Sequence, residues 1–137
     1  MAYWLLKTEP STYSLSDLLN DRSTLWTGVR NYQARNHLRA MARGDGVVIF
    51  HTGTQKCAVG LAKVLANPVD DPTAPGEDWV AVDIGSAKAF STPVSLATIK
   101  SSPAFSSMAM LKLSRLSVSP VTAKEWAALL RLAKTTA

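Results

Sequence analysis

"DGVVIFHTGTQKCAVGLAKVLA", residues 45–66, contains two apolar runs that are separated only by a short polar connection. The first run is rich in Val, Ile and Phe and the second in Ala, Val and Leu, so we predict strands over 45–53 and 57–66. Gly60, inside the second run, indicates a bulge or a close approach of another backbone. Because only a short connection separates these strands, we expect both of them in one mixed sheet.

Three further segments have the length and composition of strands. They are residues 2–7, 79–90 and 113–121. Short helical turns are expected over "SLATIK" and "SSPAFSS". Together these elements predict an α+β fold, with a bent mixed β-barrel of about five to six strands and short helices around it. The length of 137 residues predicts one domain, residues 1–137.

Helix starts are marked by local capping signals. Ser14 with Asp17, and Thr122 with Glu125, have the spacing of a capping box, in which two side chains bind each other's backbone N–H groups. A helix is therefore expected after each pair. The second of these is the closing helix, whose buried face is predicted to contain Trp126, Leu129, Leu130 and Ala133.

Composition favours an anionic partner and a reducing environment. The net charge is +5 and the isoelectric point is about 9.6. Cys57 is the single cysteine, so neither an internal disulfide nor a Cys-rich metal site is expected. No apolar run has the length of about 20 residues that a membrane helix needs, and the N-terminus does not resemble a secretory signal. We expect a cytoplasmic monomer without membrane, metal or cofactor.

The segment "WTGVRNYQARNHLRAM", residues 26–41, combines arginines, side-chain amides and aromatics, and no acid occurs between Arg22 and Gly44. A helix is predicted from an N-cap at Asn31 to a C-cap at Gly44. Guanidinium groups suit phosphate, amides suit the edge of a nucleobase, and aromatic rings suit base stacking. The alternative is a helix with a hydrated polar face and Trp26 in the core.

Recognised catalytic patterns are absent, since no phosphate-binding Gly loop, paired metal histidines or nucleophile elbow occurs. A binding protein is therefore favoured over an enzyme. One alternative is an enzyme that acts on a modified nucleotide or nucleic acid, with Glu9 or His51 as the acid–base group. Another is a small-molecule binder that uses the same pocket.

Several motifs together resemble the EVE domain family, including its bacterial single-domain members. They are "YWLLKTEP", "GVRNYQARN", "FHT", "WVAVD" and "RLSVSPVT", in this order over residues 3 to about 130. The resemblance implies a PUA-like fold and a non-catalytic module that binds DNA or RNA. It also implies that a flipped base, methylated or hydroxymethylated, enters an aromatic-walled pocket.

The resemblance assigns roles to individual residues. The predicted base pocket contains Lys7, Thr8, Trp26, Asn31, Tyr32, Gln33, Phe50, His51 and Thr52. The predicted phosphate contacts are Arg30, Arg35, Arg39 and Arg43, although these arginines could instead lock the loops. Predicted structural residues near the pocket are Glu9, Pro10, Asn36 and Arg115. Thr8 and Phe50 stand where the family more often has Ser and Tyr, which bears on base preference.

Overall fold

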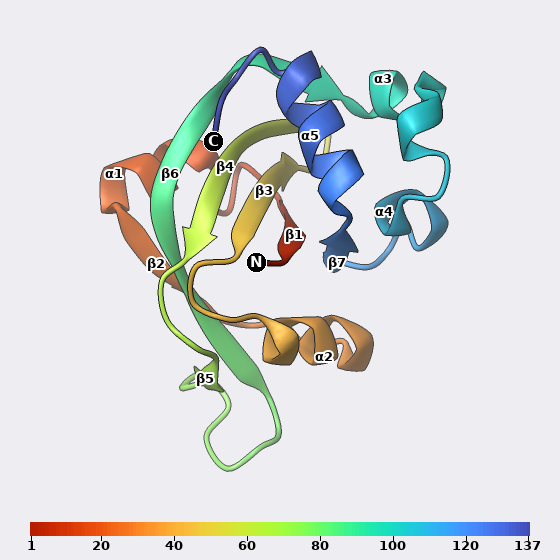
Figure 1. Ribbon diagram of the computed structural model, residues 1–137. Helices are drawn as coiled ribbons and strands as arrows, with labels where there is room; N and C mark the ends of the chain where they lie inside the picture. The colour runs from red at the N-terminus through yellow and green to blue at the C-terminus, as the bar shows by residue number, and fades with distance from the viewer.

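A computed structural model describes residues 1–137 and shows one mixed seven-stranded sheet with short helices on both faces (Figure 1). The strands are β1 (Tyr3–Thr8), β2 (Ser23–Trp26), β3 (Gly46–His51), β4 (Cys57–Val64), β5 (Val69–Asp70), β6 (Val80–Ser95) and β7 (Val118–Val121). The helices are α1 (Leu15–Asp21), α2 (Tyr32–Ala40), α3 (Leu96–Ser101), the 3₁₀ turn η1 (Pro103–Phe105), α4 (Ala109–Lys112) and α5 (Ala123–Leu132).

The predicted α+β fold with a mixed sheet is confirmed, but the sheet is open and does not close into the predicted barrel. Its order is β2-β6-β4-β3-β1-β7, and β5 pairs only with β6. β1 pairs in parallel with β3, and the other pairs are antiparallel. The two end strands, β2 and β7, do not bond to each other. Helix α2 contacts both β7 and β6, so a helix occupies the gap that hydrogen bonding would have to close.

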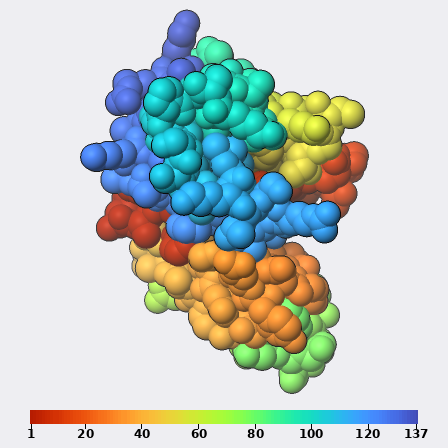
Figure 2. All heavy atoms as spheres, turned by 90° about the vertical axis from the view of Figure 1, so that its right-hand side faces the viewer, coloured from red at the N-terminus to blue at the C-terminus, as the bar shows by residue number.

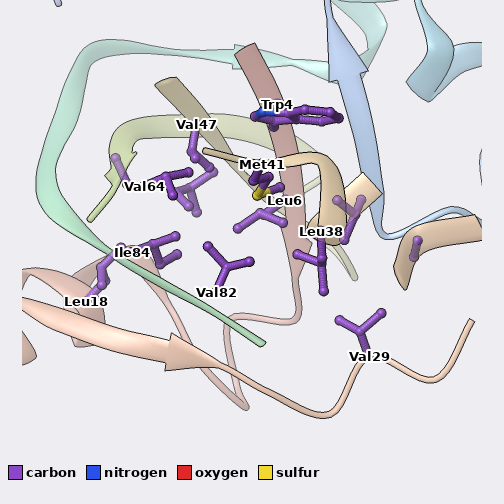
Figure 3. Close-up of a cluster of buried hydrophobic side chains, with 14 of the residues drawn as sticks. Trp4, Leu6, Leu18, Val29, Leu38, Met41, Val47, Val64, Val82 and Ile84 are labelled. Carbon is purple, nitrogen blue, oxygen red and sulfur yellow. The ribbon is translucent and has the colours of Figure 1, made fainter. Parts of the chain in front are cut away.

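Two apolar clusters fill the two faces of the sheet. The first lies under α1 and α2 and includes the side chains drawn in Figure 3, among them Leu6, Leu38 and Val82. The second lies under α3, η1, α4 and α5 and contains Phe105 and Leu129. Because successive side chains of a strand point to opposite faces, β3 contributes to both clusters.

Local signals place most helix starts correctly. Both predicted capping boxes form, at Ser14 with Asp17 and at Thr122 with Glu125. Asn31 caps α2 by accepting a hydrogen bond from the Ala34 N–H. The predicted end of this helix is too late, since α2 ends at Ala40 and Met41 takes the C-cap position.

The five predicted strands are present with different ends, and two further strands, β2 and β5, were not predicted. The strand predicted over 113–121 is limited to β7, because residues before Val118 follow α4 in turns. The close approach predicted at Gly60 is confirmed, since a Cβ there would lie 2.6 Å from the Lys88 carbonyl oxygen. None of the helices combines the length and the apolar character required to cross a membrane.

Candidate functional site

A cavity of about 530 Å³ opens beside the ends of β1 and β2. Six of the residues singled out from the sequence line it, namely Lys7, Thr8, Glu9, Trp26, Arg30 and Asn31. Tyr13 and Ser117 also contribute to the lining. The volume is within the range of about 300–1,000 Å³ that is typical of small-ligand sites.

Two aromatic residues, Trp26 and Tyr13, line the cavity with their rings at right angles. The rings of Trp26 and Tyr13 pack edge to face, with centroids 6.1 Å apart and an interplanar angle of 88°. Both side chains are half-buried and rest on the first apolar cluster. Burial raises the pKa of Tyr13, and its hydrogen bond of 2.9 Å to the Asp21 carboxylate raises the pKa further. Tyr13 was missed by sequence reasoning because it follows a turn rather than a recognisable motif.

The turn after β1 is held by short polar contacts. Thr8 Oγ1 donates to the Tyr13 carbonyl oxygen at 2.6 Å. The Glu9 carbonyl oxygen accepts from the backbone N–H groups of Thr12 and Tyr13, each at 2.9 Å. Glu9 Oε1 accepts from the Ser11 backbone and hydroxyl. These bonds give the turn a fixed shape and bring Tyr13 back toward the cavity.

Lys7 connects the cavity to the chain before β7. Its Nζ donates to the Ser114 carbonyl oxygen at 2.7 Å, and its backbone N–H donates to the Ser117 carbonyl oxygen at 2.9 Å. Burial lowers the pKa of Lys7. One ammonium proton is engaged by Ser114, which leaves two donors for a ligand.

A buried carboxylate holds the loop after β2, which lines the cavity with Gly28 and Arg30. Asp71, 1% exposed, accepts from the Gly28 backbone N–H at 2.8 Å and from Arg30 at 3.0 Å. Its other oxygen accepts from the Thr73 N–H and hydroxyl. Burial alone would raise the pKa of Asp71, but these hydrogen bonds outweigh it, so the pKa lies well below its usual value. Asp71 therefore remains an anion that Arg30 neutralises.

The arginines of α2 are also paired with an acid, although no acid occurs between Arg22 and Gly44. Asp78 bridges Arg35, at 3.2 Å, and Arg39. The Arg35 guanidinium lies over the Tyr32 ring at 5.0 Å, and Tyr32 stacks on Trp79 at 5.1 Å. These contacts tie α2 to the acidic loop between β5 and β6. The structure thus favours the loop-locking role for Arg35 and Arg39.

Other predicted residues lie near the cavity but outside its lining. Tyr32, 67% exposed, belongs to the stack with Trp79. Gln33 lines a second hollow of about 310 Å³, which shares Asn31 with the cavity and also includes Arg115. Asn36 accepts hydrogen bonds from Arg35. The exposed Arg43 forms no ion pair.

Phe50 does not face the cavity, which corrects its predicted place beside Trp26. Its ring is 3% exposed and lies in the second apolar cluster, on the face of the sheet covered by α5. His51 is buried, and its Nε2 accepts from the Leu15 N–H at 3.0 Å while Nδ1 lies 2.7 Å from Gln55 Oε1. The half-buried Thr52 donates its backbone N–H to the Thr8 carbonyl oxygen.

No three His, Cys, Asp or Glu side chains gather as a metal-binding group. The cavity is instead lined by the aromatic residues Trp26 and Tyr13 and by the polar residues Lys7, Glu9 and Asn31. Flat rings with a few polar groups at their edge are the chemistry that holds a planar heterocycle.

Comparison with known proteins agrees with this arrangement. The EVE domain family model matches residues 2–132. The chain belongs to the EVE domain family. Thymocyte nuclear protein 1 of Mus musculus is 31% identical over 167 residues, which cover 97% of this chain and 74% of the mouse protein.

Solved structures of EVE domain proteins share the fold. Rpa0253 from Rhodopseudomonas palustris, solved by NMR, is 41% identical with a TM-score of 0.93, over 98% of this chain and 94% of that one. Human THYN1 was crystallised in complex with DNA containing 5-methylcytosine. It is 27% identical with a TM-score of 0.90, over 100% of both chains. Its complex shows that an EVE domain relative binds modified DNA.

Proposed function

We propose that this EVE domain binds DNA carrying a modified base, with 5-methylcytosine as the first candidate, and holds that base in the cavity beside Trp26. The observation that carries the proposal is the pair of half-buried rings, Trp26 and Tyr13, at a cavity of about 530 Å³. The modified DNA bound by human THYN1 supports the same class of ligand.

Polar groups at the cavity suit the edge of cytosine. Glu9 Oε2 lies against Gly53 without a hydrogen bond, and this exposed carboxylate can turn to accept from an exocyclic amine. The Asn31 amide nitrogen and the Lys7 ammonium can donate to the ring carbonyl and nitrogen. A cytosine would therefore find both an acceptor and donors within one site.

Stacking and hydrogen bonding must offset the cost of extruding the base. Extrusion costs a few kcal/mol, and stacking on an aromatic side chain contributes about 1–3 kcal/mol per base. A buried methyl group adds about 0.8 kcal/mol, or roughly fourfold in affinity. We expect a modest preference for the methylated base from apolar burial.

The test compares wild type with two variants of Trp26 on matched duplexes. The duplexes have one sequence and differ only in a single central cytosine or 5-methylcytosine, and an RNA of the same sequence forms a third arm. Fluorescence anisotropy gives the ratio of the two DNA affinities. Wild type and Trp26→Phe should prefer the methylated duplex, because both retain a flat ring. Trp26→Ala should lose the preference.

Circular dichroism and thermal unfolding confirm that each variant is folded. A folded Trp26→Ala protein that keeps the wild-type preference would place base capture elsewhere. Equal affinity of wild type for both duplexes would contradict recognition of 5-methylcytosine, and tighter binding to the RNA would contradict DNA as the polymer.

A further inference from the structure

The second hollow borders the base cavity. Both are lined by Asn31, and Leu116 in the hollow is followed by Ser117 in the cavity. Lys7 reaches from the cavity to the Ser114 carbonyl oxygen, at 2.7 Å, and Ser114 also lines the hollow. Figure 2 shows the surface on which the segment around α4 (blue) meets α2 (orange). A nucleic-acid strand that leaves the cavity could therefore lie between the segment around α4 and helix α2.

The hollow carries a positive charge that no acid of the chain offsets. Arg115 is its one charged lining residue, is exposed, and forms none of the ion pairs in the structure. Arg30, Arg35 and Arg39 are instead paired with Asp71 and Asp78, which offset two of their three positive charges. An unpaired guanidinium attracts phosphate more strongly than one whose charge a carboxylate already offsets.

Side-chain amides complete the polar lining. The Gln33 side chain has no hydrogen bond within the protein, and Asn31 uses only its oxygen, to cap α2. Both amide nitrogens remain available as donors for sugar or phosphate oxygens. The hollow thus combines a cation with neutral donors and lacks the aromatic rings of the base cavity.

We propose that the second hollow receives the sugar-phosphate of the nucleotide next to the captured base, with Arg115 as its phosphate contact. The proposal rests on the proposed function, because it places the DNA strand relative to the base cavity. It also transfers the main phosphate contact from the α2 arginines to the segment that precedes β7.

The experiment measures affinity for the methylated and unmethylated duplexes between about 50 and 200 mM salt, where phosphate contacts appear as a slope of affinity against salt. Arg115→Ala is compared with Arg131→Ala, which removes the same charge from an exposed position on α5. Arg115→Ala should weaken binding to both duplexes by about tenfold and reduce the salt slope by about one. Arg131→Ala should match wild type.

Arg115→Lys provides a further control, since it keeps the charge but loses the planar fork. It should retain the wild-type salt slope with an intermediate affinity. All variants should unfold at the wild-type temperature, because Arg115 is exposed.

The outcomes separate this proposal from the proposed function. Arg115→Ala and Arg131→Ala with equal salt slopes would overturn the phosphate site, even if wild type still prefers the methylated duplex. A reduced slope in Arg115→Ala together with no preference in wild type would support the phosphate contact and defeat recognition of 5-methylcytosine.

Discussion

The carboxylate of Asp71 accepts a hydrogen bond of 2.8 Å from the backbone N–H of Gly28, 43 residues earlier in the chain. This bond fixes the loop that follows Trp26 and lines the cavity. Asp71 therefore positions part of the cavity wall although it is not itself a lining residue. Arg30 and Thr73 bind the same carboxylate and keep it in place.

Asp71→Asn should destabilise the protein at neutral pH by about 1–3 kcal/mol, because buried donors lose a charged acceptor. The folded-state pKa of Asp71 lies below its unfolded value of about 3.9, so its contribution is complete above about pH 5 and is lost as the pH falls. Wild type should therefore lose more stability than Asp71→Asn between pH 7 and pH 3. Thermal unfolding at both pH values measures this difference.

The matched control for that experiment is Asp70→Asn, which changes the exposed neighbour in the same way. It should follow the wild-type dependence on pH. If Asp71→Asn kept the full wild-type loss of stability in acid, the carboxylate would not be the anionic anchor of the Gly28 loop.

Asp78→Ala should raise the affinity for methylated and unmethylated DNA alike, and should steepen its dependence on salt. The substitution removes an acid and releases the guanidinium groups of Arg35 and Arg39 next to the cavity. The cost in stability should be below about 1 kcal/mol, because Asp78 is 75% exposed. Anisotropy titrations at several salt concentrations provide the measurement.

Glu77→Ala is the control for charge alone, since Glu77 is exposed and contacts no arginine. A salt slope equal in Asp78→Ala and Glu77→Ala would show that bound DNA does not reach the α2 arginines.

Thr8→Val should reduce stability and DNA affinity, whereas Thr8→Ser should leave both close to wild type. Thr8→Val removes the hydroxyl that donates to the Tyr13 carbonyl oxygen at 2.6 Å, whereas Thr8→Ser retains it. The valine variant should be less stable by about 1 kcal/mol and should bind DNA more weakly, because the turn that places Tyr13 is loosened. Chemical unfolding and anisotropy test the two effects. Equal behaviour of both variants would exclude a role for this hydroxyl.

Interactions close in sequence were predictable, because their partners lie within one helical turn. Ser14 with Asp17 and Thr122 with Glu125 could be recognised from spacing, and so could the cap at Asn31. The position of Trp26 at a cavity followed from the family resemblance rather than from any local pattern.

Long-range features could not be predicted, and β3 shows the physical reason. The strand "GVVIFH" is buried on both faces, so it has no polar–apolar alternation to indicate which way Phe50 points. The partners of Arg30 and Arg35 lie 41 and 43 residues away, so the paired charges looked free in the sequence. The open sheet likewise depends on long-range packing, since α2 lies between its two ends.

β1 lies inside the sheet, between β3 and β7, and its Lys7 is bonded to Ser114 and Ser117. During synthesis, the edge of β1 that pairs with β7 therefore stays unpaired until β7, more than a hundred residues later, has been made. Contacts that span more than a hundred residues slow folding. A ribosome-tethered fragment ending before β7 should accordingly lack a finished binding site, and ligand capture should begin only after that final strand has emerged.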